Sequence, residues 1–382
     1  MFSRRLLSAA WVTAGVLVLT GCFEAPDAPH EPGALALVIG NRSNMPLPVL
    51  PKRVVDIIED SILSKDTVYL VAVSGEPKLV RQLKIEHDCD SKKACDTEVG
   101  KQTQAIARAI EDAKAEAPEA DTLGAIGIAA DNLSAFTGSG PKQLVVVDSG
   151  LQTAGEMPLQ DPGAMAADPK AVATALKKAG SLDSLKGVNV LFTGLGSTVK
   201  PQTPLPAGKR STLKKLWQTV LEAGGAKVQI DTAQLVDNPP LGGLPAVTEV
   251  PVEEPKPPVP LPCIRVREDQ IGFLPDEATF RDDAAAEDVL RPTAEKLKAE
   301  SASATLTGTT AVPDRTGLSL RRAEAVKARL VNLGVPADSL ETRGVGINFD
   351  GFVPDTDKNG NLIETKAVQN RQVIIAIDGR SC

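Results

Sequence analysis

The stretch TGTTAVPDRTGLSLRRAEAV, residues 307–326, decides the fold of the C-terminal part of the chain. Its first residues complete the β-branched run ATLTGT (304–309), which predicts a strand, and the proline and glycine that follow predict a short loop. Apolar residues then recur at helical spacing, which predicts a helix over 319–333 with Ser319 as its N-cap. Two arginines therefore stand in the first turn of a helix, where a guanidinium and the helix dipole together favour an anion.

Strands and helices alternate on both sides of this stretch. CIRVREDQIGF (263–273) is expected to begin with a strand, and a helix is expected over 283–300. LETRGVG (340–346) and RQVIIAI (371–377) predict the last two strands. This order predicts an α+β unit over 263–382, in which helices pack on a sheet.

The order βαβαβ with a final strand, together with LSLRRAEAVKARLVNLGV, RGVG and QNRQV, resembles the OmpA-like peptidoglycan-binding domain over nearly all of 263–378. The resemblance implies a site that grips the diaminopimelate of cell-wall peptides. In that family an Asp after the second strand faces the ligand's ammonium, and the Arg of the RA pair holds its carboxylate. Arg322 matches that arginine, and Asn370 and Arg371 match the Asn-Arg pair before the last strand.

The chain departs from this family where the ammonium should be held. Ala311 stands in place of the Asp, and the loop is a few residues shorter than usual. Asp314, three residues on, is the nearest carboxylate and our candidate replacement. Three interpretations stay open: the domain binds peptidoglycan, it is a scaffold without that affinity, or it recognises another ligand.

A proline-rich segment separates this unit from an earlier one. Residues 236–262, VDNPPLGGLPAVTEVPVEEPKPPVPLP, lack apolar periodicity and predict a semi-rigid linker. Over 34–235 helices alternate with apolar strands: ALALVIG, TVYLVAV, KLVRQLKIEH, KQLVVVDSG, VNVLFTG and KVQI. We expect an α/β unit, a mostly parallel sheet with helices on both faces and one antiparallel edge made by the hairpin at SGEP.

That order resembles the von Willebrand factor A-like fold over most of 34–235. The family's metal site uses an Asp-x-Ser-x-Ser loop after the first strand, a Thr between two middle helices and an Asp after the fourth strand. Here the first loop reads GNRSNM (40–45), in which the Asp is absent and one Ser survives, whereas Thr122 and Asp148 stand at the other two places. With one carboxylate left we expect no metal ion. Asp148 and Ser149 either line a binding face or cap a turn.

The N-terminus predicts export and a lipid anchor. Arg4 and Arg5 precede the apolar run LLSAAWVTAGVLVL, which is too short for a comfortable transmembrane helix. The ending LTGC at Cys22 resembles a bacterial lipobox, whose Cys becomes the lipidated first residue; an ordinary signal with a chance Cys is the alternative. We therefore expect residues 1–21 to be a lipoprotein signal peptide, 22–33 a tether, and the protein to be membrane-anchored in the cell envelope, facing the wall or periplasm.

Export would allow the other cysteines to pair, because the compartment is oxidising. Four cysteines permit three pairings. Cys89 and Cys95 share one polar loop and are expected to pair, which leaves Cys263 to bind Cys382. Zinc is not expected, since the chain has two histidines and no CxxC pair.

Other activities find little support. The net charge of −7, without any Lys/Arg run longer than two, argues against nucleic acid as the main partner. GLGST (194–198) is not a nucleophile elbow, and His30 and His87 lie outside any triad pattern, so we expect no enzyme and no cofactor. DTDKNGNLIE (355–364) begins like a calcium loop but has Lys366 at the twelfth position, and an Asn-Gly turn explains it equally well.

We therefore expect a non-catalytic envelope lipoprotein that links a membrane to peptidoglycan. The alternative is a binding or adhesion module whose C-terminal domain is only structural.

Overall fold

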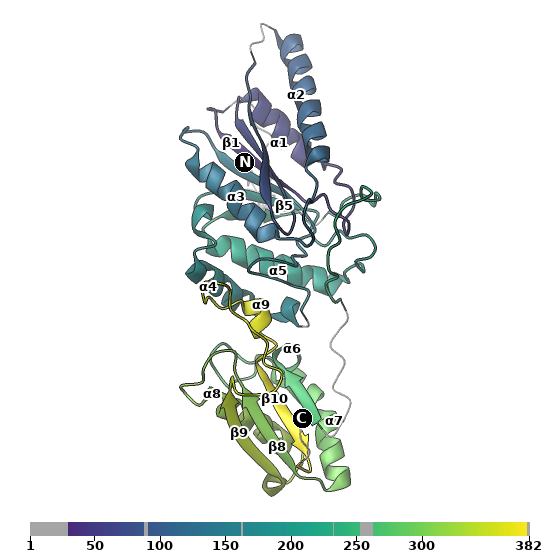
Figure 1. Ribbon diagram of the computed structural model, residues 1–382, viewed down its shortest axis with the longest axis vertical. Helices are drawn as coiled ribbons and strands as arrows, with labels where there is room; N and C mark the ends of the chain where they lie inside the picture. The colour runs from purple at the N-terminus through teal and green to yellow at the C-terminus, as the bar shows by residue number, and fades with distance from the viewer. Residues whose placement is uncertain (1–29, 88–90, 162, 232, 253–262, 380–382) are drawn as a thin grey trace, which may run out of the picture.

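The computed structural model describes residues 30–379 except 88–90, 162, 232 and 253–262 (Figure 1). Two units follow one another along the long axis of the molecule. The predicted signal peptide and Cys22 lie outside the described residues, as do Cys89 and Cys382. Cys95 and Cys263 are each disulfide-bonded, and the pairs Cys89–Cys95 and Cys263–Cys382 stay predictions.

Six strands form the N-terminal sheet, in the order β3-β2-β1-β4-β5-β6. The strands are β1 (Ala34–Ile39), β2 (Thr67–Ala72), β3 (Lys78–Lys84), β4 (Lys142–Val147), β5 (Asn189–Thr193) and β6 (Lys227–Ile230). Neighbouring strands run parallel except β2 and β3, which are antiparallel. This confirms the predicted mostly parallel sheet with one antiparallel edge.

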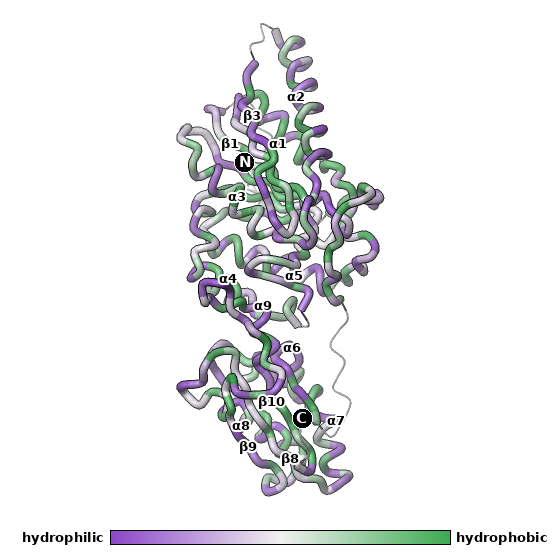
Figure 2. The backbone as a smooth tube through the Cα atoms, in the orientation of Figure 1, coloured by the Kyte–Doolittle hydropathy of each residue, from purple (hydrophilic) through white to green (hydrophobic). Residues whose placement is uncertain are grey.

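Helices cover both faces of this sheet. Successive side chains of a strand point to opposite faces, and every residue of β1 is buried, so both faces must be covered. Ala34, Ala36 and Val38 pack with one set of helices, and Leu35, Leu37 and Ile39 pack with the other. The first set is α3 (Thr122–Ala135), α4 (Pro169–Ala179) and α5 (Ala207–Ala223), and the second is α1 (Lys52–Leu63) and α2 (Lys92–Asp112). Hydrophobic and hydrophilic stretches alternate along α2 (Figure 2). Short 3-10 helices lie at η1 (Ala164–Ala166) and η2 (Asp183–Leu185).

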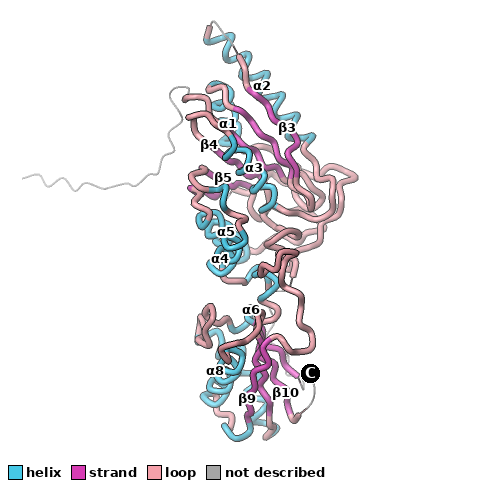
Figure 3. Tube along the Cα trace, turned by 60° about the vertical axis from the view of Figure 1, so that its left-hand side comes forward, coloured by secondary structure: helices cyan, strands magenta, loops and turns pink. Residues whose placement is uncertain are grey.

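The C-terminal unit has a four-stranded sheet in the order β7-β10-β8-β9. Its strands are β7 (Cys263–Arg267), β8 (Ala304–Thr309), β9 (Leu340–Gly346) and β10 (Gln372–Ile377). β10 is antiparallel to β7 and β8, whereas β8 and β9 are parallel. Its helices are α6 (Glu268–Ile271), α7 (Asp283–Glu300), α8 (Leu318–Asn332), η3 (Ala337–Ser339) and α9 (Glu364–Ala367). α7 and α8 bury the core against the sheet, as predicted (Figure 3).

The start of α8 differs from the prediction. Gly317, with a φ of 72°, is the N-cap, and Ser319 lies inside the helix, 2% exposed. The Ser319 hydroxyl and backbone N–H both bind the carboxylate of Asp314. Ser319 as N-cap was therefore wrong, because Asp314 supplies the acceptor that the first turn needs.

The first part of the predicted linker is not a free spacer but packs on the N-terminal unit. Val247 and Val250 are 6% and 1% exposed and belong to the core of the N-terminal unit. The side chain of Gln202 donates to the carbonyl of Val250 at 3.0 Å and accepts from its N–H at 2.8 Å. Residues 236–252 thus pack on the first unit, and only 253–262 lie outside the described structure.

The two units meet at α9. This helix packs against α4 and η1, and Val368, just after it, is 3% exposed and belongs to the core of the N-terminal unit (Figure 1). Gly163 lies so close to Asp269 that a Cβ atom on it would be 2.8 Å from a carboxylate oxygen. The end of the C-terminal sheet that carries α6 and α9 therefore faces the first unit.

Candidate functional site

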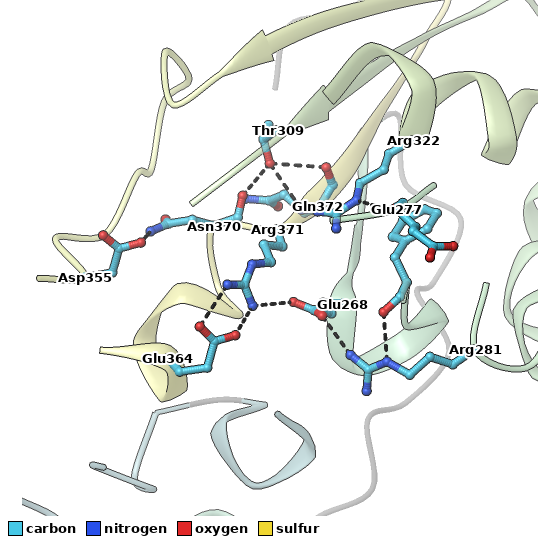
Figure 4. Close-up of polar contacts among 11 residues, drawn as sticks. Glu268, Glu277, Arg281, Thr309, Arg322, Asp355, Glu364, Asn370, Arg371 and Gln372 are labelled. Carbon is cyan, nitrogen blue, oxygen red and sulfur yellow. Dashed lines mark hydrogen bonds and ion pairs between the residues drawn. The ribbon is translucent and has the colours of Figure 1, made fainter. Parts of the chain in front are cut away.

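Arginines and glutamates form a cluster at this end of the C-terminal sheet (Figure 4). Glu268 accepts from Arg281 at 2.7 Å with one oxygen and from Arg371 at 3.1 Å with the other. Arg371 also binds both carboxylate oxygens of Glu364, one of them at 3.0 Å. Burial works against the charge on Arg371, but Glu364 and Glu268 raise its pKa. Arg371 is thus held as a cation between two carboxylates.

Arg322 belongs to the same cluster but has a different set of partners. It is 4% exposed, its Nε donates to the carbonyl of Glu277 at 3.0 Å, and its guanidinium lies 5.0 Å from the ring centre of Phe273. Among the described residues its two terminal nitrogens have no acceptor. Burial lowers the pKa of Arg322, whereas Glu268 raises it. Arginine stays protonated even so, and Arg322 is the cation of this cluster that lacks a carboxylate.

Asn370 is committed to the fold. It is 0% exposed, and its amide donates to the carbonyl of Val353 at 2.7 Å and to Asp355 at 2.8 Å. Its side-chain oxygen accepts from the N–H of Val353 at 2.8 Å. Its backbone carbonyl accepts from the hydroxyl of Thr309 at the end of β8. Asn370 therefore fixes the preceding loop to the sheet and offers little to a ligand.

Asp314 does not face Arg322. One of its oxygens accepts from the N–H groups of Thr316 at 3.1 Å and Leu318 at 2.9 Å, and the other accepts from the N–H and hydroxyl of Ser319. Partial burial pushes the pKa of Asp314 up, but these hydrogen bonds outweigh it and lower the pKa to about 2. Asp314 caps α8 and lines a shallow groove beside β9, so it does not complete a zwitterion site with Arg322.

The loop at 355–364 is a turn. Asp357 accepts from the N–H groups of Asn359 and Asn361, both at 2.8 Å, and from the Asn361 amide at 3.0 Å. Gly360 has a φ of 81°, which this turn requires. In the part of the chain that the structure describes, no group of three or more His, Cys, Asp and Glu side chains could hold a metal ion.

A second polar cluster lies in the N-terminal unit, where β1 has β2 on one side and β4 on the other. Such a switch point in strand order is where open α/β sheets bind ligands. Arg42 follows β1, Asp148 follows β4, and both are 0% exposed. Nη2 of Arg42 lies 2.9 and 2.8 Å from the Asp148 oxygens and 2.8 Å from the hydroxyl of Ser149. Thr122 donates to Asp148 at 3.1 Å. Thr122, Asp148 and Ser149 meet here, as the sequence suggested.

Arg42 was missed by sequence reasoning, although an arginine in the loop that follows a fully apolar strand was a usable signal. Its guanidinium and the N–H of Gly150, at 2.6 Å, occupy the Asp148 carboxylate. A Cβ atom on Gly40 would lie 2.0 Å from an Asp148 oxygen, so no side chain fits at this position beside Asp148. The residues present do not fit a divalent ion, because an arginine already neutralises the one carboxylate.

Several buried polar atoms around Arg42 lack partners among the described residues. They are Nε and Nη1 of Arg42, both amide atoms of Asn44, and the hydroxyls of Thr193 and Thr198. The segment 236–252 lies nearby, since the hydroxyl of Ser43 donates to the carbonyl of Pro245 at 2.8 Å. Unpaired buried polar groups are costly, so this polar interior carries an energetic penalty that the apolar core does not.

Residues 272–361 match the OmpA family. Among solved structures, the OmpA-like domain of FopA1 from Francisella tularensis is 20% identical and is matched over 30% of this chain and 69% of that one, with a TM-score of 0.22. The peptidoglycan-associated lipoprotein from Burkholderia pseudomallei is 23% identical, with coverages of 30% and 88% and a TM-score of 0.23. The cell wall anchor of the T6SS from Pseudomonas aeruginosa is 20% identical, with coverages of 30% and 78% and a TM-score of 0.24.

A search of curated proteins found no match. Within the described residues, no helix has the length and apolar character needed to cross a membrane. The family match and the order of strands and helices agree, so the C-terminal part of the chain is an OmpA-like domain.

Proposed function

We propose that this protein is a non-catalytic component of the cell envelope whose OmpA-like domain binds peptidoglycan through a stem-peptide carboxylate held by Arg322. The observation that carries the proposal is the state of that arginine. It is almost buried and its terminal nitrogens have no acceptor among the described residues, whereas its neighbours Arg281 and Arg371 are each bonded to a carboxylate.

Charge balance favours a ligand carboxylate at Arg322. A buried guanidinium that is bonded to no carboxylate retains much of the cost of leaving water. A ligand carboxylate would offset that cost with charge-assisted hydrogen bonds. Phe273 stacks beneath the guanidinium and the carbonyl of Glu277 holds its Nε, so the side chain is oriented before any ligand arrives. Such preorganisation strengthens binding.

The scaffold alternative also has support. Asn370 and Arg371, which match the family's binding pair, are both engaged inside the protein. The family's Asp is missing at Ala311, and Asp314 caps a helix instead of replacing it. If Arg322 also serves only the fold, the domain is a structural module and the chain binds other molecules.

Sedimentation with purified peptidoglycan separates the two. The soluble chain 23–382 should pellet with the wall, and Arg322→Ala should weaken binding by about 2–4 kcal/mol, the cost of losing a charged hydrogen-bond partner. Arg322→Lys should recover only part, because an ammonium lacks the planar fork. Arg315→Ala, which removes an exposed arginine from the loop before α8, is the matched control. Equal pelleting of Arg322→Ala and wild type would support the scaffold.

We also propose a lipid anchor at Cys22, on the strength of the LTGC ending. The anchor would make the protein a link between a membrane and the wall. Cys22→Ala should block acylation and move the protein from the membrane to the soluble fraction. Mass spectrometry of the mature N-terminus tests this directly, since an unmodified start at another residue contradicts it.

A further inference from the structure

We infer that the Arg322 site selects a carboxylate with no ammonium beside it, such as the carboxylate of an N-acylated amino acid or of a peptide C-terminus. This inference rests on the proposed function and names its ligand class. It follows from what surrounds Arg322 and from what is missing there.

The end of β8, where an ammonium would be received, carries no negative charge. Ala311 is 5% exposed and has no polar side chain. The hydroxyl of Thr310 donates to the carbonyl of Val312 at 2.7 Å. The hydroxyl of Thr309 donates to the carbonyls of Asn370 and Gln372. Both hydroxyl hydrogens are thus used within the protein. None of Thr309, Thr310 and Ala311 carries a carboxylate that could pair with an ammonium.

The neighbouring carboxylates are already in use. Asp314 takes four hydrogen bonds at the start of α8, and Asp355 accepts from Asn370 at 2.8 Å. Glu268 joins Arg281 to Arg371, and Glu364 holds Arg371. Each of these carboxylates is therefore already bonded to a partner inside the protein.

Two other acidic residues lie near Arg322, and neither replaces the missing buried carboxylate. Asp276 and Glu277 are exposed to solvent, and although Asp276 raises the pKa of Arg322, neither carboxylate is bonded to Arg322 among the described residues. Figure 4 shows the Glu277 carboxylate on the side away from Arg371. They do not supply the buried anion that the family places at the end of the second strand.

Arg281 and Arg371 are thus paired with Glu268 and Glu364, whereas Arg322, which is bonded to the carbonyl of Glu277, has no hydrogen-bonded carboxylate among the described residues. A ligand carboxylate would supply this third guanidinium with a counter-ion. An ammonium on the adjacent carbon would meet like charges without a compensating acceptor. Acylation of that nitrogen removes the charge and keeps the carboxylate, so the site should prefer acylated ligands.

The test is a direct titration of the soluble chain 23–382, read from the side-chain Nε–Hε signal of Arg322 by NMR, with Arg322→Lys identifying the signal. The probes are N-acetyl-D-alanine and D-alanine, which differ by an acetyl group that removes the charge on the nitrogen. N-acetyl-D-alanine should bind at least tenfold more tightly. Equal binding, tighter binding of D-alanine, or no response to either probe would overturn the inference.

Variants at position 311 separate charge from shape. Ala311→Asp should shift the preference at least threefold toward D-alanine, whereas Ala311→Asn, of the same size without the charge, should not. A shift in both variants, or in neither, contradicts the charge argument. Pelleting with peptidoglycan is measured separately. If the Arg322 signal responds to the acylated probe while the wall does not bind, the proposed function fails and the ligand class stands.

Discussion

Nη2 of Arg42 lies 2.9 and 2.8 Å from the two carboxylate oxygens of Asp148, and neither side chain is exposed. The pair joins the ends of β1 and β4 at the switch point of the N-terminal sheet. A positive charge thus stands beside the carboxylate where the von Willebrand A-like pattern would place a metal ion. Because Nε and Nη1 of Arg42 are unpaired among the described residues, the pair is not fully compensated.

Breaking this pair should be costly. Arg42→Met leaves Asp148 buried without a counter-ion, and we expect the free energy of unfolding to fall by about 3–5 kcal/mol. The double variant Arg42→Met/Asp148→Leu should recover much of that loss, since apolar residues of similar volume often replace a buried pair at little cost. Urea denaturation of the three proteins measures both effects. A loss below about 1 kcal/mol in the single variant would contradict the argument.

Asp121 should make stability fall as the pH rises. Burial raises its pKa to about 6, although the N–H of Gly124 works in the opposite direction. An acid whose folded pKa lies above its unfolded value destabilises the fold once the pH rises between the two. Asp121→Asn keeps an acceptor for Gly124 and should be more stable than wild type by about 1–2 kcal/mol above pH 6, with no difference below about pH 4. Denaturation at pH 4 and 7.5 measures it, and a variant less stable at pH 7.5 would refute the prediction.

Asp314 should make stability rise with pH, which is the opposite of the effect of Asp121. Its pKa is lowered to about 2, so it contributes stability above the unfolded pKa that is lost as the pH falls toward 2. Asp314→Asn should lower the melting temperature at pH 7, and the gap should narrow between about pH 4 and 2. Asp338→Asn, at an exposed position in η3, is the control. A gap that stays constant with pH would show that charge is not the cause.

The sequence predicted the fold well because the strands and helices of both sheets have clear patterns in short stretches of sequence. Six consecutive buried residues in β1 read as a strand covered on both faces, and the alternation with helices implied parallel pairing. The loop lengths and apolar spacing around 304–333 similarly defined the C-terminal order. These signals lie within a few residues of each other, which is the range that periodicity can report.

The sites were harder because their partners come from distant parts of the chain. Arg42 and Asp148 are 106 residues apart, and nothing in either segment indicates the other. Asp314 is near Ala311 in the sequence. Its carboxylate instead accepts hydrogen bonds from the N–H groups at the start of α8, which the sequence did not indicate. The segment 236–252 is rich in proline and has no apolar periodicity. Nothing in its sequence therefore indicated that Val250 is buried.

The contact between the two units should depend on Val368. This residue follows α9 and belongs to the core of the N-terminal unit, although the chain around it belongs to the OmpA-like domain. Val368→Asp would place a carboxylate in that apolar contact, where burial of an unpaired charge is unfavourable. We expect the two units to separate, with a larger radius of gyration in small-angle scattering.

Glu364 of α9 gives this prediction a second readout, because it holds Arg371 beside Arg322. If docking of α9 steadies that ion pair, Val368→Asp should also change the response of Arg322 to N-acetyl-D-alanine. Val312→Asp, at a position that is 51% exposed, is the control and should leave the scattering unchanged. A compact Val368→Asp variant would show that the contact of α9 with α4 and η1 does not depend on this side chain.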